Sequence, residues 1–167
     1  MSLPARSPRS RPANGRSTDD VSPLDKRIIE HLQADGRRPF TQIAAELGVS
    51  EAAVRARTNR LIERGILQVV GVTDPLKLGF HQMAMIGIRC ESAKLIEVAE
   101  HLAEMPEVDY VVITAGSYDL LIETVCEDND ALLTFLADRL RAIDGVRETE
   151  TFVYLRLVKQ TYQYGTR

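Results

Sequence analysis

Apolar residues recur every three or four positions from residue 24 onwards, a spacing that predicts amphipathic helices. The first helix is expected to follow Ser22-Pro23, because serine is a good N-cap and proline suits the first helical position. Asp25 stands where it can complete a capping box with the serine. The pair Asp35-Gly36 predicts the end of this helix.

Two more helices are predicted at short intervals. The second follows Pro39 and is expected to end at Gly48, and the third is capped by Ser50 and ends at Gly65. Residues 66–73 are rich in Val and Ile and predict a strand, which an Asp-Pro pair ends.

The second half of the chain contains a repeat, in which Leu95 aligns with Leu133 and Leu102 with Leu140. The expected elements are strands at 83–90, 108–114, 120–126 and 146–158 and helices at 94–104 and 129–142. Two tandem βαβ units of this size predict a ferredoxin-like βαββαβ domain, an antiparallel sheet with two helices on one face. The other face would expose Val, Ile and Tyr side chains, which predicts association into at least a dimer.

The fold class expected for the whole chain is α+β, with a helix-turn-helix (winged-helix-like) domain first and the ferredoxin-like domain second. The expected segments are a disordered basic arm at 1–20, the helix-turn-helix domain at 21–66, a linking strand and hinge at 67–80, the ferredoxin-like domain at 81–160 and a tail at 161–167. The arm contains four arginines and almost no apolar side chain, so it cannot bury enough surface to order itself.

Charge is distributed unevenly along the chain, although the formal net charge is only −3. Residues 1–70 contain 12 Lys and Arg against 8 Asp and Glu, whereas residues 71–167 contain 9 against 16. A basic first part joined to an acidic second part places contact with a polyanion on the first domain.

Several classes of protein are disfavoured by the sequence. The longest apolar run, 110–120, is too short for a membrane span, and the N-terminus lacks the apolar segment of a secretory signal. Cys90 and Cys126 lack the spacing of metal ligands and indicate buried thiols in a reducing compartment. No cluster of His and Cys and no glycine-rich phosphate loop occurs, so we expect no metal, no cofactor, no membrane association and a cytoplasmic, nucleoid-associated protein.

The third predicted helix carries the candidate nucleic-acid contacts. If Val54, Leu61 and Ile62 point inward, helical geometry leaves an outward face made of Glu51, Ala52, Arg55, Ala56 and Asn59. Arg and Asn can pair with guanine and adenine edges in the major groove of double-stranded DNA, while Arg57, Arg60 and Arg64 suit phosphates. The alternative is a helical hairpin whose arginines only solvate a surface.

Four segments together resemble the Lrp/AsnC, or feast/famine, family of transcription regulators. They are SPLDKRIIEHLQADGR, AAELGVSEAAVRARTNRLIERGIL, VITAGSYDLLIETV and IDGVRETETFVYLRLVK, and the resemblance covers about residues 21–160. It implies a DNA-binding domain tethered by a strand to an effector-binding and oligomerisation domain, which forms homodimers through its sheet and often octamers. Thr58 stands where an aliphatic residue is usual, and the Arg-rich N-terminal extension is not part of the family pattern.

The resemblance also implies that a small effector, usually an amino acid, binds near the G-x-Y-D loop. The candidate residues are Thr114, Ala115, Gly116, Ser117, Tyr118 and Asp119, with Thr151 expected nearby. Gly116 is expected to allow backbone angles that turn the loop amides toward a carboxylate, and Asp119 could accept hydrogen bonds from an α-ammonium. From the residues alone, an ordinary β-turn with a satisfied aspartate is the competing interpretation.

Three functions remain to be compared at this point. The first is a sequence-specific DNA-binding regulator whose oligomeric state or DNA affinity responds to an amino acid. The second is an enzyme on the same architecture, similar to the sirohaem decarboxylases, and the third is a stand-alone metabolite-binding module. Four arginines within one predicted helix favour the regulator, because neither alternative needs a basic helix that reads a groove.

Overall fold

The computed structural model describes residues 21–161 and residue 165. These form two compact units, which divide between Val70 and Gly71. The predicted basic arm at 1–20 and most of the predicted tail lie outside the described residues.

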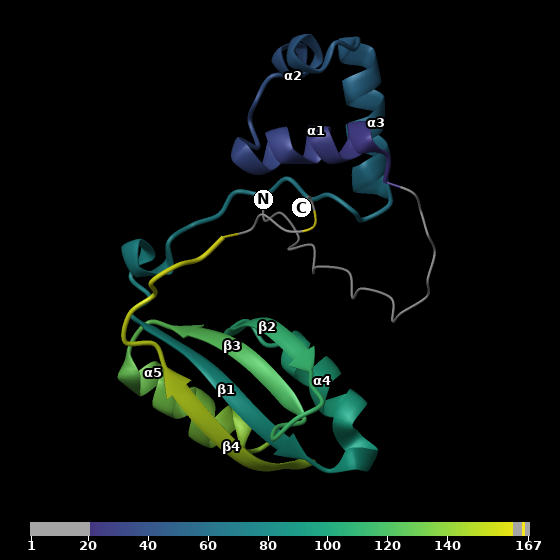
Figure 1. The fold of residues 1–167 in the computed structure, drawn as a ribbon. Coiled ribbons are helices and arrows are strands. Elements are labelled where there is room, and N and C mark those ends of the chain that lie inside the picture. The colour runs from purple at the N-terminus through teal and green to yellow at the C-terminus, as the bar shows by residue number, and fades with distance from the viewer. Residues whose placement is uncertain (1–20, 162–164, 166–167) are drawn as a thin grey trace, which may run out of the picture. The chain divides into compact units, whose positions relative to one another are not determined.

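The first unit consists of the helices α1 (Pro23–Ala34), α2 (Phe40–Leu47) and α3 (Glu51–Glu63), shown in Figure 1. The predicted capping box at the start of α1 is confirmed. The Oγ of Ser22 accepts a hydrogen bond from the Asp25 amide over 3.2 Å, and the Asp25 carboxylate accepts one from the Ser22 amide over 3.1 Å. This box satisfies two backbone donors that the helix itself leaves unpaired.

The turn between α2 and α3 is also built as predicted. Gly48 has a φ of 68°, a left-handed conformation that a residue with a side chain rarely adopts. Ser50 then caps α3 by accepting a hydrogen bond from the Ala53 amide over 3.2 Å. The core of this unit consists of Ile28, Ile29, Leu32, Ile43, Ala44, Val54, Leu61 and Leu67.

The inward face of α3 differs from the prediction at one position. Val54, Thr58 and Leu61 are buried, whereas the side chain of Ile62 is 44% exposed. With 3.6 residues per turn, positions 54, 58 and 61 fall on one stripe, and position 62 lies to its side. The inward face of the helix therefore includes a threonine in place of the predicted isoleucine.

The strand predicted at residues 66–73 is not formed within the described part of the chain. Val69, Val70 and Val72 are instead about half exposed or more. Their β-branched side chains favour an extended backbone, but a strand also needs a neighbour for its hydrogen bonds. The winged-helix-like feature is therefore absent from residues 21–70, and the segment continues into a short 3₁₀ turn, η1 (Pro75–Leu78).

The second unit is the predicted ferredoxin-like domain. Its elements are the strands β1 (Gln82–Cys90), β2 (Val108–Ile113), β3 (Leu120–Cys126) and β4 (Val146–Val153), with the helices α4 (Leu95–Ala103) and α5 (Asn129–Thr134). The sheet order is β2-β3-β1-β4, and every neighbouring pair is antiparallel. At its centre, Ile86 of β1 pairs with Ile122 of β3 and Thr151 of β4.

Two predicted boundaries in this unit are corrected. The helix predicted at 129–142 is α-helical only to Thr134 and continues as a wider π-helical segment, Phe135–Leu140. The last strand ends at Val153 rather than at residue 158, and Leu155 is 97% exposed. The Val- and Leu-rich composition of residues 154–158 supports an extended chain. The last β1–β4 pair is Ala84 with Val153, and the Tyr154 amide still donates to the Met83 carbonyl over 2.8 Å. Since β1 begins at Gln82, one residue before Met83, it offers no partner for the later residues of the predicted strand.

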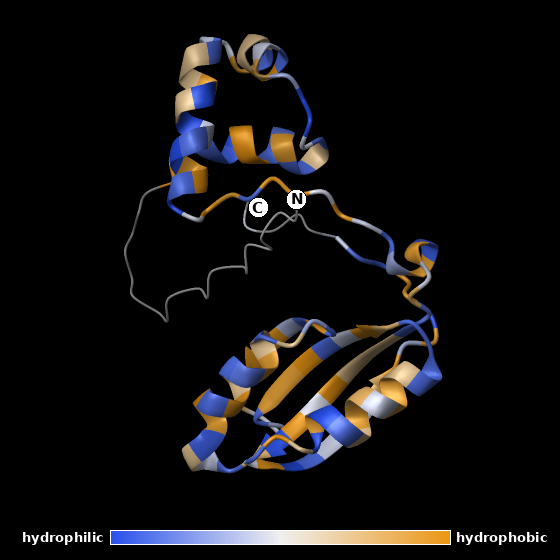
Figure 2. Ribbon diagram, turned by 180° about the vertical axis from the view of Figure 1, so that it is seen from behind, coloured by the Kyte–Doolittle hydropathy of each residue, from blue (hydrophilic) through white to orange (hydrophobic). Residues whose placement is uncertain are grey.

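The two helices cover one face of the sheet, as Figures 1 and 2 show from opposite sides. The core between these layers consists of buried residues of the strands and helices: Ala84, Ile86, Ile88, Cys90, Val98, Leu102, Met105, Leu120, Ile122, Cys126, Leu132, Phe135 and Leu140. The two cysteines are far apart along the sheet, because Cys90 is the last residue of β1 and Cys126 of β3 pairs with Gln82, the first residue of β1. Burial raises the pKa of both thiols.

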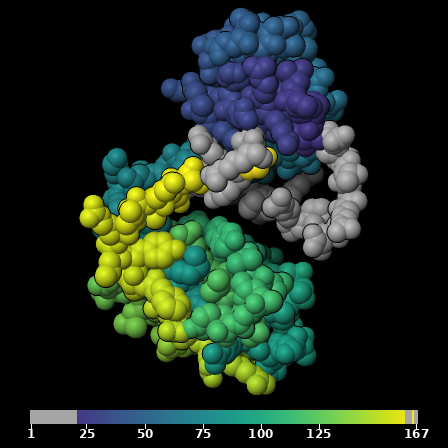
Figure 3. All heavy atoms as spheres, in the orientation of Figure 1, coloured from purple at the N-terminus to yellow at the C-terminus, as the bar shows by residue number. Residues whose placement is uncertain are grey.

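Within residues 71–161 no helix covers the other face of the sheet, which we call the open face. Tyr110 of β2 and Phe152 of β4 reach its surface with about half of their side chains exposed. Side chains of β4 (yellow) and of β2 and β3 (green) lie at the surface in this view (Figure 3). The predicted apolar face is therefore present in the structure.

Candidate nucleic-acid interface and ligand loop

The outer face of α3 presents the predicted residue types to solvent. Ala52, Arg55, Ala56 and Asn59 are exposed, and Glu51 is half-buried. Because the two alanines are small, the longer side chains of Arg55 and Asn59 project furthest from this stretch of the helix. The guanidinium of an arginine and the side-chain amide of an asparagine are the groups that bind guanine and adenine edges in a major groove.

Arg55 is held by two neighbours. Its guanidinium pairs with the Glu51 carboxylate at 2.5 Å, one helical turn away, and lies 5.2 Å from the centre of the Phe40 ring. The ring belongs to α2, so the contact joins both helices of the pair. The role of Phe40 was missed by sequence reasoning, although an aromatic residue directly after Pro39 was a visible signal.

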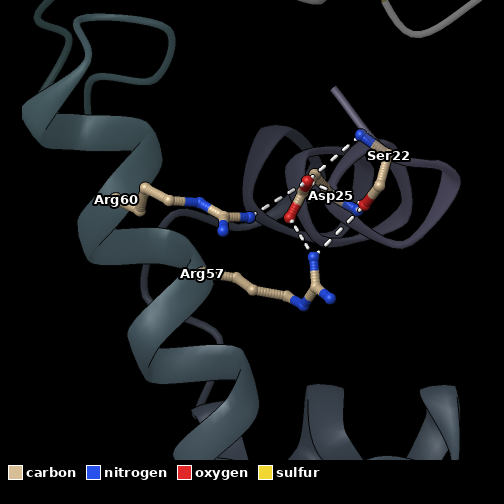
Figure 4. A network of polar contacts seen from close by, with 4 residues as sticks. All are labelled: Ser22, Asp25, Arg57 and Arg60. Carbon is tan, nitrogen blue, oxygen red and sulfur yellow. Dashed lines mark hydrogen bonds and ion pairs between the residues drawn. The ribbon is translucent and has the colours of Figure 1, made fainter. Parts of the chain in front are cut away.

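Arg57, predicted to contact phosphate, is half-buried and contacts α1 of its own domain. It donates hydrogen bonds to the Asp25 carboxylate over 3.0 Å and to the Ser22 hydroxyl over 3.2 Å (Figure 4). The side chain of Asp25 is only 1% exposed. Its burial favours the neutral acid, but the hydrogen bonds from Ser22 and Arg57 outweigh this effect, so that the pKa of Asp25 is lowered.

The other two predicted phosphate contacts occupy intermediate positions. Arg60 lies 3.5 Å from the second oxygen of Asp25, yet its side chain remains 52% exposed. Arg64 is half-buried at the C-terminal end of α3. Of the three predicted phosphate-binding arginines, Arg60 is therefore the most accessible to a DNA backbone.

The loop at residues 114–119 joins β2 to β3 and is closed by its own hydrogen bonds. The Thr114 amide donates to the Asp119 carbonyl over 2.9 Å, and the Thr114 hydroxyl donates to the Tyr118 carbonyl over 2.5 Å. The Asp119 carboxylate accepts a hydrogen bond from the Cys90 amide over 2.9 Å. Asp119 thus fastens the loop to the end of β1, as the β-turn interpretation expected.

The exposed tip of the loop consists of Ala115, Gly116 and Ser117. The expectation for Gly116 is corrected, because its φ does not lie in the positive region that only glycine adopts readily. The backbone turns here through a conformation open to other residues, so this glycine supplies small size rather than a special angle.

Thr151 does not join the rest of the predicted loop site. It pairs with Ile86, which is fully buried on the helix-covered side of the sheet, and directly opposed residues share a face. Tyr118 instead lies against Gly87, the next residue along β1, where its ring takes the place that a Gly87 side chain would occupy on the open face. Alternation along the strand therefore places Thr151 and Tyr118 on opposite faces.

A separate hollow of about 400 Å³ lies between α4 and the segment after α5, and no loop residue lines it. Its lining residues are Glu97, Val98, His101, Met105, Arg139, Ala142, Ile143 and Asp144.

Among the described residues, His, Cys, Asp and Glu side chains form no group that could hold a metal ion. The helices in this part of the chain are also all too short or too polar to cross a membrane.

Comparison with known families matches both units. The family model of the AsnC-type helix-turn-helix domain matches residues 22–62, and that of the Lrp/AsnC ligand binding domain matches residues 83–164. An HTH-type transcriptional regulator of Pyrococcus abyssi, itself uncharacterized, is 36% identical over 140 residues, which cover 83% of this chain and 89% of that protein. The regulator LrpA of Pyrococcus horikoshii is 35% identical over 140 residues, covering 83% of this chain and 99% of that protein.

Solved structures show the same architecture. The structure of AsnC from E. coli matches with a TM-score of 0.78 at 27% identity and covers 86% of this chain and 97% of that one. A feast or famine regulatory protein of M. tuberculosis, complexed with L-methionine, matches with a TM-score of 0.79 at 24% identity and covers 86% of this chain and 98% of that one. The matches at both units and over most of the length of these relatives show that the chain belongs to the Lrp/AsnC family of DNA-binding transcriptional regulators, not to a family of enzymes.

Proposed function

We propose that this regulator reads double-stranded DNA with the outer face of α3. The observation that carries the proposal is the exposed face on which Arg55 and Asn59 lie one turn apart, flanked by small alanines. Arg55 would donate two hydrogen bonds to a guanine edge, and the Asn59 amide would both accept from and donate to an adenine edge. Arg60 would contact a phosphate and set the register of the helix.

Arg55 must leave Glu51 when it reaches a base. The pair is largely exposed, with 59% of the arginine side chain and 42% of the glutamate side chain accessible, so separating its charges costs little in water. The Phe40 ring supports the guanidinium from the other side and limits the directions in which it can point. Glu51 is then free to accept a hydrogen bond from a cytosine amino group.

We infer further that the second unit binds a small amino acid at the tip of the 114–119 loop. Asp119 uses one oxygen for the Cys90 amide, and a carboxylate has lone pairs enough to accept from an α-ammonium as well. The backbone amides of the exposed residues Ala115, Gly116 and Ser117 would receive the carboxylate of the ligand. Two structurally similar proteins, from M. tuberculosis and Neisseria meningitidis, are complexes with L-methionine, which makes this amino acid the first probe.

The open face provides the surface for assembly in this proposal. Pairing two copies of the sheet would cover Tyr110 and Phe152, and a dimer would present two α3 helices to successive major grooves. Dimers would associate further, to an octamer for example, and the effector would act by binding one packing of the dimers more tightly than another. Such a regulator would work in the cytoplasm, in association with the nucleoid.

DNA recognition is tested by selecting bound duplexes from a random-sequence pool and measuring affinity for the enriched sequence by fluorescence anisotropy. We expect one enriched motif, and we expect Arg55→Ala and Asn59→Ala to relax it at different base positions. Arg37→Ala is the matched control, because Arg37 is exposed on the same unit but lies outside α3. A wild-type selection without an enriched motif would contradict the proposal.

Effector binding is tested on the full chain by thermal shift against the twenty protein amino acids, beginning with L-methionine. An active amino acid should raise the melting temperature of the protein and change its DNA affinity over the same range of concentrations, because both effects report one binding equilibrium. A bound tetrapyrrole with visible absorbance would instead favour enzyme-like chemistry on this architecture.

A further inference from the structure

Arg89 of β1 contacts the 114–119 loop in two ways. Its Nε donates a hydrogen bond to the Ser117 carbonyl over 2.8 Å. Its guanidinium carbon also lies 5.7 Å from the centre of the Tyr118 ring, within the range of a cation–π contact. A third contact, an ion pair of 2.9 Å with Glu148 of β4, orients the guanidinium from the far side.

Gly87, two residues earlier on the same face of β1, makes room for this arrangement. A Cβ at this position would lie 2.6 Å from Cγ and 2.7 Å from both Cδ atoms of Tyr118. The ring therefore rests directly on the backbone of Gly87, and any side chain there would displace it. Phe152 of β4 completes the surroundings, with its ring centre 6.4 Å from that of Tyr118 in an edge-to-face arrangement.

We propose that Arg89 is a positioning residue for the 114–119 loop, and that it holds the Tyr118 ring in contact with the backbone of Gly87. Asp119 fastens the loop on one side by accepting from the Cys90 amide, and Arg89 fastens Ser117 and Tyr118 on the other. Only the tip at residues 115–117 is then left to adjust to a ligand. This role rests on the proposed function, in which that tip binds an amino acid.

The physical benefit of this arrangement is preorganisation. A loop that is already ordered loses less conformational freedom when it binds a ligand, so more of the contact energy appears as affinity. Lysine would not replace Arg89, because the guanidinium donates to Ser117 and to Glu148 from two different nitrogens while its central carbon lies over the Tyr118 ring, and an ammonium has a single nitrogen to serve all three neighbours. A half-exposed ion pair with Glu148 alone would contribute little, which makes the loop contacts the decisive ones.

The first test needs no ligand. The Thr114 amide donates to the Asp119 carbonyl across the base of the loop, and the Asp119 amide donates to the Ile88 carbonyl of β1, over 2.9 Å in each case. Exchange of these two amides with solvent therefore reports how often the loop opens and leaves β1. We expect Arg89→Ala to speed exchange of both amides about tenfold, because a lost hydrogen bond to a charged donor corresponds to at least that factor. Arg147→Ala is the matched control, since Arg147 lies on β4 and pairs with Glu91, at 3.6 Å, rather than with a residue of the loop.

Three further variants separate positioning from general stability. Tyr118→Phe should exchange like the wild type, because the contacts of Tyr118 with Gly87 and Arg89 use its ring. Arg89→Lys should not restore protection, and Gly87→Ala should speed exchange as much as Arg89→Ala does. Unchanged exchange of Thr114 and Asp119 in both Arg89 variants would overturn the proposal.

The second test measures DNA affinity against the concentration of L-methionine, or of whichever amino acid is active in the thermal-shift series. In Arg89→Ala the concentration that gives half of the response should rise about tenfold, while DNA affinity without effector stays at the wild-type value. A midpoint equal to that of the wild type would contradict the positioning role. If no amino acid acts on the wild type, the proposed effector is wrong, and amide exchange alone decides whether Arg89 holds the loop.

Discussion

The guanidinium of Arg57 donates a hydrogen bond to the carboxylate of Asp25 over 3.0 Å, which joins the middle of α3 to the first turn of α1. The acid is 1% exposed and the arginine 33%, so the pair is buried on one side and solvated on the other. An arginine of α3 therefore serves the structure of its own domain. Its contact with α1 also orients α3, because Arg55 and Asn59 lie on the side of the helix opposite to Arg57.

Replacing Asp25 should destabilise the first unit strongly. Asp25→Ala removes half of the capping box and leaves Arg57 without its charged acceptor, which we expect to lower the free energy of unfolding by about 2–4 kcal/mol. Urea unfolding followed by circular dichroism measures this loss. Glu30→Ala, an exposed change on the same helix, should shift stability by less than about 0.5 kcal/mol. Equal effects of the two substitutions would contradict the role assigned to Asp25.

The same pair predicts a dependence of stability on pH. The pKa of Asp25 is lower in the folded protein than its ordinary value of 3.8, so the unfolded chain takes up the proton first as the pH falls. The stabilisation is therefore complete above the ordinary pKa and is lost as the pH falls through the folded value. Unfolding measured from about pH 5 to about pH 2.5 should show a shallower decline in Asp25→Asn, which keeps a cap but does not ionise. Parallel curves for the variant and the wild type would refute the prediction.

Arg55 and Arg57 should behave oppositely although they lie two residues apart. Arg55→Ala should weaken binding to the selected operator by about 1–3 kcal/mol and relax base preference, with little change in stability. Arg57→Ala should lower the free energy of unfolding by about 1–3 kcal/mol, because the buried carboxylate then keeps only the longer ion pair with Arg60, and should keep the base preference. Anisotropy on the operator and on single-base variants, together with urea unfolding, separates the two. A loss of base preference in Arg57→Ala would return this residue to the DNA interface.

Thr58 offers a stabilising substitution. Its side chain is 2% exposed, and its hydroxyl finds no hydrogen-bond partner among the described residues. Thr58→Val keeps the shape of the side chain and removes the unpaired polar atom, so the free energy of unfolding should rise by about 1 kcal/mol. Thermal and urea unfolding would measure the gain, with DNA affinity as a check that α3 has not moved. A loss of stability would mean that the hydroxyl has a partner in solution.

Asp119 can be divided into its structural and its proposed binding role. Asp119→Asn keeps an oxygen that accepts from the Cys90 amide but removes the negative charge, so the loop should stay closed while effector binding weakens by about 1.5–3 kcal/mol, or roughly 10- to 150-fold. Asp119→Ala should weaken effector binding and also speed exchange of the Cys90 amide. DNA affinity against effector concentration and amide exchange provide the two readouts. An unchanged effector response in Asp119→Asn would show that the carboxylate contacts no ammonium.

Local signals predicted the elements of both units well. Ser22, Gly48 and Ser50 lie at the helix ends where the sequence placed them, because caps and left-handed turns depend on residues within one turn of each other. The strand predicted at 120–126 is confirmed to the residue, and its buried and half-buried positions alternate strictly in the structure. The same reasoning failed at residues 66–73, where an extended chain lacks a neighbouring strand within the described residues.

The amino-acid sequence by itself determined the element order, the helix-turn-helix and the ferredoxin-like plan, because periodicity and turn residues act over short distances. Only the tertiary structure decided that Arg57 pairs with Asp25 and that Tyr118 rests on Gly87. Each of these contacts joins residues more than 30 positions apart, so it exists only after helices or strands have packed. Until then an arginine on a helix or a glycine in a strand is compatible with several roles, and packing selects among them.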